Sequence, residues 1–294
     1  MNSVASRGSF RVASYNVLNL FDKIDDPDKR DEGTHPKSVE SERALAEIME
    51  SSEADVIALQ EVENIDILTQ FRNSNGLADD YPHVVLVEGN DGRGIDVALF
   101  SKHPITNVES HKDEVFPIEG QKDRGFLRDL LQADIEIPDY GPVRFFVNHF
   151  ASKRGGKRAD SMREAEAQAA RNIIKRETAD FPGQKYVMLG DFNDTPDSKS
   201  VQTLTRKDND GWGLVDAFRD EPDTVSYPTS ERTARKWGYK RIDQILLSPE
   251  MAKDQVEEQA HKHPRSEDAS DHWMVSVAQP ICLSQAPWVI HEPT

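Results

Sequence analysis

The chain has 294 residues, of which 36% are hydrophobic and 30% are charged, and this composition is typical of a soluble globular protein. Its 53 acidic residues outnumber 36 basic ones, and the net charge of −17 argues against a protein that coats nucleic acid. No apolar run approaches the roughly 20 residues that a membrane-spanning helix needs. The single cysteine, Cys282, excludes an intrachain disulfide framework and a multi-cysteine zinc site, and we expect it to be inert.

The chain shows neither a targeting segment nor an internal linker. Residues 1–10 lack the basic and apolar parts of a secretory signal, so the cytoplasm is the default location, although a removed signal peptide would leave no trace. We expect residues 1–9 to be a flexible N-terminus and residues 10–279 to form one domain, because no Pro/Gly/Ser-rich stretch divides them. Residues 280–294 are expected to form a weakly specified tail, and the protein is expected to be a monomer.

Hydrophobic patterns in the first half of the chain predict alternating strands and helices. In chain order they predict a strand at 10–16, a loop at 22–37, a helix at 38–51, a strand at 55–60 ending at Glu61, a short helix at 64–73, and strands at 84–87 and 95–100. The helix at 38–51 carries Leu45, Ile48 and Met49 at helical spacing, and Ser38 or Ser41 is its expected N-cap.

The second half repeats this alternation. It predicts a hairpin of strands 126–137 and 143–147 about a turn at 138–142, the longest helix at 157–179, a strand at 186–189, a short helix at 198–205, and strands at 241–247 and 273–278. The order strand, helix, strand therefore occurs at 10–61 and again at 143–193. Because sequence identity between the two halves is negligible, this repetition is evidence about architecture only.

Polar side chains follow the predicted strands where each strand ends. Seven residues lie at such ends: Asn16, Glu61, His149, Asp191, Asn193, Asp271 and His272. An eighth, Asp243, lies within the apolar run 241–247. Each has an ordinary structural explanation, such as a turn residue or a hydrogen-bonded core histidine, but so many at strand ends indicate a functional site. Attack on a phosphate ester needs carboxylates for a divalent cation, amides or imidazoles for phosphate oxygens, and a base for water.

Two segments are basic although the chain as a whole is acidic. Residues 152–176 contain eight bases and three acids, and the bases are Lys153, Arg154, Lys157, Arg158, Arg163, Arg171, Lys175 and Arg176. A second basic cluster consists of Arg232, Arg235, Lys236, Lys240 and Arg241. Each cluster is either a solvated helix face and loop or a flank of the site that holds a polyanion.

The ordered motifs resemble one known family. The motifs are Ser14-Tyr15-Asn16, Leu59-Gln60-Glu61, Val147-Asn148-His149-Phe150, Gly190-Asp191-Phe192-Asn193, Arg241-Ile242-Asp243-Gln244-Ile245-Leu246 and Ser270-Asp271-His272. Together they resemble the endonuclease/exonuclease/phosphatase family, which includes DNase I, abasic-site endonucleases, sphingomyelinases and inositol polyphosphate 5-phosphatases. The resemblance runs from about Phe10 to Val277. It implies an α/β (α+β) fold, a four-layer sandwich of two mixed β-sheets face to face with helices outside and the site at one end.

The resemblance also implies which residues bind metal and phosphate. Carried over by position, Glu61 would hold a catalytic Mg²⁺ or Mn²⁺, with Asp271 and Asn16 near the metal, and oxygen ligands suit such hard cations. Asn193 and His149 would bind the scissile phosphate and offset its growing negative charge.

Proton transfer and substrate contacts are implied in the same way. Asp191 would orient or deprotonate the attacking water, while His272 would contact phosphate or transfer a proton, with its tautomer fixed by Asp243. Arg128, on the strand that leads into the hairpin turn, would either bind phosphate and support the site or be structural. In the first basic cluster, Lys153, Arg154 and Arg158 are the expected substrate contacts.

Differences from individual members narrow the branch. Leu18 stands where abasic-site endonucleases carry an acid, and His149 stands where they carry a tyrosine. Both differences favour the DNase I-like and phosphodiesterase branches. Residues 238–243 lack the Pro-Ala-Trp-Cys-Asp segment of inositol polyphosphate 5-phosphatases, whereas residues 148–156 look more like bacterial nuclease-like members.

The leading hypothesis is a metal-dependent phosphodiester hydrolase, a nuclease that cleaves DNA or RNA by water attack on the phosphate. A sphingomyelinase-like or inositol-phosphatase-like enzyme for lipids or small molecules is the first alternative. Net negative charge slightly favours that alternative, and the lack of a membrane-inserting apolar hairpin counts against a lipid substrate. The second alternative is an inactive binding scaffold, against which every expected site position is filled.

Overall fold

The computed structural model describes residues 9–31, 33–180, 183–253, 257–261 and 266–280. Cys282, which we predicted to be inert, lies outside the described residues. The predicted flexible N-terminus and C-terminal tail also lie outside them, apart from Ser9 and Pro280, which belong to strands. No helix among the described residues is long and apolar enough to cross a membrane.

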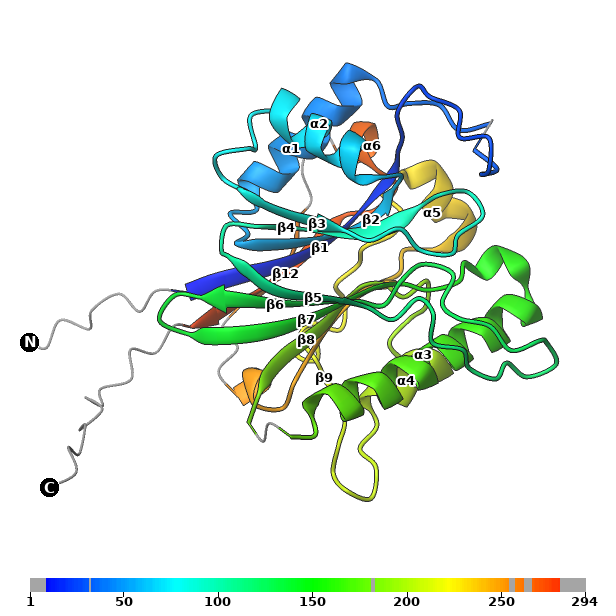
Figure 1. Ribbon diagram of the computed structural model, residues 1–294, viewed down its shortest axis with the longest axis vertical. Coiled ribbons are helices and arrows are strands. Elements are labelled where there is room, and N and C mark those ends of the chain that lie inside the picture. The colour runs from blue at the N-terminus through cyan, green and yellow to red at the C-terminus, as the bar shows by residue number, and fades with distance from the viewer. Residues whose placement is uncertain (1–8, 32, 181–182, 254–256, 262–265, 281–294) are drawn as a thin grey trace, which may run out of the picture.

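Two six-stranded mixed sheets pack face to face (Figure 1). The first sheet has the order β11 (Glu257–His261), β12 (Met274–Pro280), β1 (Ser9–Leu20), β2 (Val56–Val62), β4 (Asp96–Ser101) and β3 (His83–Leu86). The second has the order β5 (Ile105–Ser110), β6 (Leu131–Ile137), β7 (Gly141–His149), β8 (Lys185–Asp191), β10 (Asp243–Leu247) and β9 (Val215–Asp216). The predicted fold class is therefore confirmed.

Helices cover the outer face of each sheet (Figure 1). The first sheet is covered by α1 (Val39–Ser51), α2 (Ile65–Ser74) and α6 (Ser266–Ala269), and the second by α3 (Lys157–Thr178) and α4 (Lys199–Thr205). The short α5 (Glu231–Trp237) lies near one end of the sandwich, and the 3₁₀ turns η1 (Lys153–Gly155) and η2 (Met251–Lys253) complete the helical elements described. Ser38 caps α1 by accepting a hydrogen bond from the Ser41 amide, which decides between the two predicted caps.

Alternation along the strands builds three apolar layers. In β1, Val12 faces the core between the sheets, whereas Ala13 and Tyr15 face α1 and α2. In β8, Leu189 faces the same central core and Met188 faces α3. Burying a side chain of this size contributes about 1.5–3 kcal/mol, so these layers fix the register of each strand firmly.

Each sheet contains one parallel pair joined through a helix. The pairs are β1–α1–β2 and β7–α3–β8, as the repeated strand–helix–strand order predicted. The carboxyl ends of two parallel strands meet at the same edge of a sheet, so polar residues that follow them lie together. Asn16 is accordingly in register with Gln60, next to Glu61, and His149 is in register with Asp191.

Several elements differ from the sequence prediction. The strand expected from residue 126 begins only at Leu131, so Arg128 lies in an irregular segment and not on a strand. The strands β5, β9 and β11 and the helices α5 and α6 were not predicted. The central residues of β5 are exposed and α5 buries none of its residues, so neither carries the apolar periodicity that marks a packed element.

Candidate active site

Polar side chains converge at the end of the sandwich where the two parallel pairs end. Asp243 begins β10 directly opposite Asp191, which ends β8, and Asp191 is in turn opposite His149 at the end of β7. Three neighbouring strands of the second sheet therefore place His149, Asp191 and Asp243 in one row. The first sheet supplies Asn16, Glu61, Asp271 and His272.

Unusual backbone conformations form the edges of this site. Glu61 and Asn193 adopt left-handed conformations with φ of 66° and 50°, which few non-glycine residues do without a structural or functional reason. Gly190, with φ of 147°, lies so close to β7 that a Cβ built on it would be 1.9 Å from the Asn148 carbonyl oxygen. Only glycine lets β8 approach β7 in this way directly before Asp191.

Asn16 links the two sheets at the site. Its Nδ2 donates to Glu61 Oε1 at 3.2 Å and to Asp191 Oδ2 at 3.1 Å, while its Oδ1 accepts from the Leu18 amide. Asp191 also accepts from the Asn193 amide at 2.7 Å and from Asn193 Nδ2 at 3.2 Å. The Asp191 carboxylate is thus held by three donors on two residues. Its burial, reinforced by the charge of Asp243, raises its pKa above the usual range.

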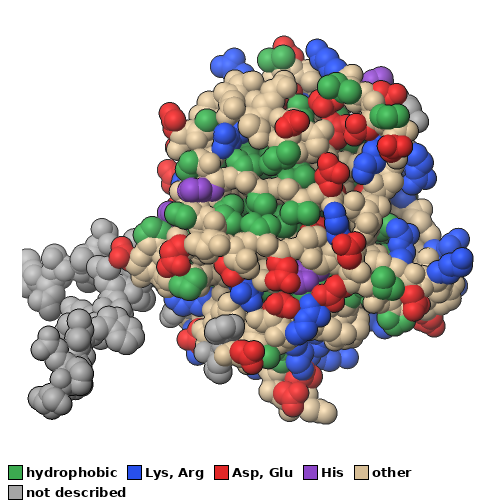
Figure 2. Space-filling view, in the orientation of Figure 1, with side chains coloured by type: hydrophobic (Ala, Val, Ile, Leu, Met, Phe, Trp, Pro, Cys, Tyr) green, Lys and Arg blue, Asp and Glu red, His purple; other side chains and the backbone are tan. Residues whose placement is uncertain are grey.

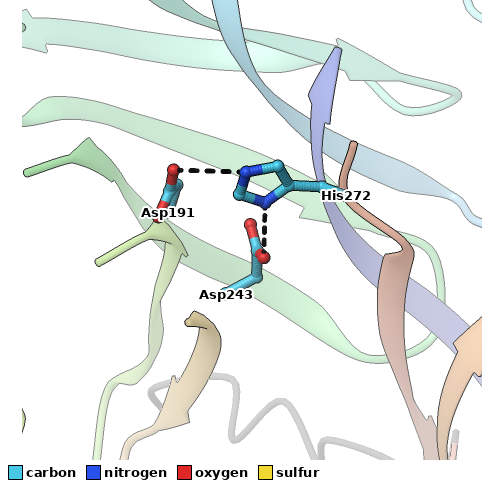
Figure 3. A group of neighbouring side chains, drawn as sticks. All are labelled: Asp191, Asp243 and His272. Carbon is cyan, nitrogen blue, oxygen red and sulfur yellow. Dashed lines mark hydrogen bonds and ion pairs between the residues drawn. The ribbon is translucent and has the colours of Figure 1, made fainter. Parts of the chain in front are cut away.

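His272 lies between two buried carboxylates (Figure 3). Its Nδ1 is 2.8 Å from Asp243 Oδ2, and its Nε2 is 3.9 Å from Asp191 Oδ2 and 3.9 Å from Asp271 Oδ1. Burial alone would lower the pKa of His272, but the charges of Asp243, Asp191 and Asp271 outweigh it and raise the pKa. The imidazole is therefore held by Asp243 on one nitrogen and presents the other to the site.

His149 has the opposite electrostatic character. Its Nε2 lies 3.5 Å from Asp191 Oδ2 and 4.0 Å from Glu61 Oε1. Burial, followed by the positive charges of Arg128, His272 and Arg93, lowers its pKa well below the usual value, so it is neutral at neutral pH. A neutral imidazole can donate a hydrogen bond to a phosphate oxygen without losing a proton.

Arg128 lies beside His149 and contributes positive charge there. It is buried, with Nε 3.0 Å from Asp91 Oδ2, and its Nη1 has no hydrogen-bond partner among the described residues. A buried guanidinium nitrogen without a partner is costly in the absence of a ligand. An anion could accept from this nitrogen, and the phosphate-binding role of Arg128 stays a prediction.

Two of the predicted metal ligands are accessible from solvent. The side chains of Glu61 and Asp271 are 16% and 37% exposed, in contrast to the fully enclosed Asp191 and Asp243. Both of the accessible carboxylates act electrostatically on Lys37, whose Nζ donates to the Ala269 carbonyl, so they face a common region. Asn16 turns its Nδ2 toward Glu61 while its Oδ1 accepts from the Leu18 amide, so the oxygens available to a hard divalent cation here are those of the Glu61 and Asp271 carboxylates.

A tighter group is also present. One ligand atom each from Asp191, Asp243 and His272 lies within 4.8 Å of the others. Nδ1 of His272 already shares a hydrogen bond with Asp243, so these two residues form a hydrogen-bonded acid–base pair and Nδ1 is not available to a metal in the structure described.

The predicted substrate contacts differ in their availability. Arg154 and Arg158 are exposed, whereas the Nζ of Lys153 lies 2.5 Å from Asp194 Oδ1. Several other bases of the two clusters are also engaged in ion pairs: Arg163 with Asp194, Arg171 and Lys175 with Asp208, Arg176 with Glu114, and Arg241 with Asp216. The surface charge is therefore concentrated at residues 154–158 and 232–240, which is less than the sequence count suggested.

One supporting residue was not predicted. The buried Ser226 Oγ accepts hydrogen bonds from the amides of Ile242 and Asp243, both at 3.0 Å, and its carbonyl accepts one from Trp273. Ser226 therefore links the backbone at Asp243 to the backbone at Trp273, the residue after His272. A lone serine within an irregular stretch gives no sequence signal for this role.

Comparisons with known proteins agree with this arrangement. Residues 11–269 match the Endonuclease/Exonuclease/phosphatase family, and this match ends just before the Ser270-Asp271-His272 motif. No curated protein matches the chain by sequence.

Similar solved structures share the fold at low sequence identity. An endonuclease/exonuclease/phosphatase family protein from Bacteroides thetaiotaomicron has a TM-score of 0.65 and 17% identity, covering 95% of this chain and 97% of that chain. The mannosyl-6-phosphatase Bt3783 from the same organism has a TM-score of 0.63 and 17% identity over 92% and 98%. Truncated TDP2 from Caenorhabditis elegans has a TM-score of 0.61 and 20% identity, also over 92% and 98%. The chain thus belongs to the endonuclease/exonuclease/phosphatase family, whose members are phosphoesterase hydrolases.

Proposed function

We propose that this protein is a divalent-metal-dependent phosphodiesterase and that its substrate is nucleic acid. The observation that carries the proposal is the Asp243–His272–Asp191 arrangement (Figure 3), in which one imidazole lies between two buried carboxylates. Hydrolysis of a phosphate ester needs a group that activates water and one that manages charge on the leaving oxygen, and this arrangement offers both.

Glu61, with Asp271 and Asn16, would hold Mg²⁺ or Mn²⁺. The accessible carboxylates of Glu61 and Asp271 support this assignment, and Asn16 holds Glu61 through its Nδ2. When bound, such an ion polarises a phosphate oxygen and offsets negative charge. The family is generally dependent on divalent metals, which supports the same assignment.

Asp191 is the proposed base for the attacking water. The raised pKa of Asp191 is closer to neutral pH than that of an ordinary aspartate, and this favours proton transfer from water. Asn16 and Asn193 hold its carboxylate oxygens, so its orientation is fixed before substrate binds. Because Asn193 Nδ2 also donates to the Phe150 carbonyl, its first task is to position Asp191, and its contact with phosphate is secondary.

His149 and Arg128 are the proposed partners of the scissile phosphate. The neutral imidazole of His149 and the unpartnered Nη1 of Arg128 are donors that can bind phosphate oxygens, which supports this assignment. Donors fixed in a buried site stabilise the charge that develops on the phosphate oxygens. His272, kept cationic by Asp243, would stabilise or protonate the departing oxygen.

The exposed bases support nucleic acid as the substrate. Arg154 and Arg158 are exposed in the segment that follows His149, and residues 232–240 carry further exposed bases. A small-molecule phosphoesterase remains the second candidate, because the net charge of −17 disfavours long-range attraction of a polyanion and a mannosyl-6-phosphatase has the same fold. We further propose that residues 10–279 act as one domain and as a monomer.

The test is hydrolysis of plasmid DNA, RNA and bis-p-nitrophenyl phosphate in Mg²⁺, Mn²⁺ or EDTA. We expect cleavage of nucleic acid that EDTA abolishes, and Glu61→Ala and His272→Ala should each lower kcat by at least about 100-fold. Glu136→Ala is the matched control, because Glu136 is exposed on β6 near the hairpin turn at the other end of the strand. Hydrolysis of phosphorylated small molecules without cleavage of nucleic acid would favour the second candidate. Absence of any EDTA-sensitive hydrolysis would refute the proposal that the protein is a metal-dependent phosphoesterase.

A further inference from the structure

Two exposed aromatic side chains lie close together beside the candidate active site. Trp237, the last residue of α5, is 57% exposed, and Tyr239 is 48% exposed. They are the two exposed aromatic residues within the described part of the chain. Because aromatic side chains usually bury most of their surface, a pair of exposed rings two residues apart indicates a binding surface.

One ring contact links Tyr239 to the residue that follows the proposed catalytic histidine. The Tyr239 ring stacks on the Trp273 ring with centroids 5.7 Å apart and an interplanar angle of 23°. Trp273 directly follows His272, and the His272 ring is itself 5.0 Å from the Tyr227 ring. Tyr239 is therefore in contact with the segment that carries His272, and Trp237 lies two residues before Tyr239 in the chain.

Main-chain hydrogen bonds hold this surface in place. The Lys240 amide donates to the Tyr227 carbonyl at 2.7 Å, and the Tyr227 amide donates back to the Lys240 carbonyl at 2.9 Å. The Trp273 amide donates to the Ser226 carbonyl at 2.7 Å. Since Tyr239 immediately precedes Lys240, its ring is carried by backbone that is paired with the active-site segment.

The surroundings of the two rings are basic. Arg232, Arg235, Lys236 and Lys240 are all exposed, and Glu231, which pairs with Arg235 at 3.4 Å, is the one acid among residues 231–241. The Nζ of Lys236 lies 4.7 Å from the centre of the Trp237 ring. Figure 2 shows Lys and Arg side chains on the right-hand side of the view, the half of the molecule in which Figure 1 places α5 and the start of α3. On a protein with a net charge of −17, such a local basic surface is a specific feature.

Aromatic rings among Lys and Arg side chains suit single-stranded nucleic acid. The nucleobases of a single strand can stack on the protein rings while its phosphates contact Lys and Arg, whereas a duplex keeps its nucleobases stacked inside. A protein interface would instead favour a contiguous apolar centre from which charged groups are depleted.

We propose that α5 and residues 237–241 bind single-stranded nucleic acid, with bases stacked on Trp237 and Tyr239, and guide one phosphodiester toward His272. This inference rests on the proposed function, whose substrate it narrows to unpaired strands.

The binding test compares three labelled oligonucleotides in EDTA, which prevents cleavage. They share one length of about 12 nucleotides, within the range that single-strand sites cover, and they are a single strand, the same strand with abasic spacers, and a duplex. The parent should bind the base-bearing strand about tenfold or more tightly than the abasic strand, because stacking contributes of that order per base. In the double variant Trp237→Ala/Tyr239→Ala this ratio should fall to about one.

Conservative and distant variants complete the design. Trp237→Phe/Tyr239→Phe keeps two rings and should retain most of the ratio, while Val108→Ala removes an exposed apolar side chain on the edge strand β5 and should bind as the parent does. Equal binding of base-bearing and abasic strands by the parent, an unchanged ratio in the alanine variant, or preference for the duplex would each overturn the inference. Hydrolysis of bis-p-nitrophenyl phosphate by the parent, a substrate without a base, is scored separately. If the parent did not hydrolyse this substrate, the proposed function would be refuted. If it did hydrolyse it but gave any of those binding results, only the strand preference would be refuted.

Discussion

Replacing Gly190 by alanine should disrupt the protein far more than an ordinary glycine substitution. The new Cβ would lie 1.9 Å from the Asn148 carbonyl oxygen and 2.9 Å from its carbon, both backbone atoms that cannot swing away. The φ of 147° adds a conformational penalty of about 1–3 kcal/mol. Relief of the overlap would force β7 and β8 apart, at a further cost of about 1–3 kcal/mol or more. The total of about 2–6 kcal/mol or more is a large part of the roughly 5–15 kcal/mol that usually stabilises a domain.

Gly141 offers the matched control for this prediction. It also has a positive φ, of 91°, and belongs to the same pair of strands, but a Cβ there would meet nothing within 4 Å. Gly141→Ala should therefore cost about 1–3 kcal/mol from backbone strain alone. Urea unfolding of both variants measures the difference, and the activity of Gly190→Ala should fall with it, because Asp191 is the next residue. If the two variants lost the same stability, the close approach of β7 and β8 would not have the energetic role assigned to it.

Three further substitutions test buried polar side chains: Asp243 and Ser226 at the site, and Glu166 on α3, which accepts a hydrogen bond from the Ala151 amide. Asp243→Asn should lower kcat by about 100-fold or more. Because the Asp243 charge raises the pKa of His272, its loss should also move the alkaline limb of the pH–rate profile to lower pH, and an unmoved limb would exclude this coupling. Burial raises the pKa of Glu166 to about 7 from 4.5, so its neutral form favours folding and this contribution is lost as pH rises from about 4.5 through 7. Unfolding of Glu166→Gln at pH values on either side of that window should show a smaller decline of stability than the parent, and an equal decline would contradict the shift. Ser226→Ala should cost about 1–3 kcal/mol by leaving the Ile242 and Asp243 amides without their acceptor, and a stability equal to that of the parent would argue against this role.

The sequence allowed the framework of the fold to be predicted because its main strands and helices carry strong apolar periodicity. The strand–helix–strand units at β1–α1–β2 and β7–α3–β8 are the clearest cases, and their ends led directly to Asn16, Glu61, His149 and Asp191. Strand register brings these residues together in the structure. A polar residue directly after an apolar run marks the end of a strand, so such residues can be identified from the sequence.

The errors have physical causes that a pattern cannot reveal. Phe126 and Leu130 suggested a strand, but they pack into the apolar layer under α3 from an irregular segment, so Arg128 was placed on the wrong kind of element. Arg163 and Arg241 were counted as surface charge, although each is buried against an aspartate that is distant in sequence from it. Such long-range pairing depends on the tertiary structure alone.

The division of the site between two sheets has a consequence for how activity is gained and lost. The Asn16–Asp191 and His272–Asp243 hydrogen bonds each join a residue of the first sheet to one of the second. Along the chain, Asn16 and Glu61 belong to the first half, whereas His149, Asp191, Asp243 and His272 belong to the second. Neither half carries the whole proposed site, so each half alone should be inert even if it folded. Hydrolysis by a split version of this protein should return only when the two halves associate, and it would then measure their complementation.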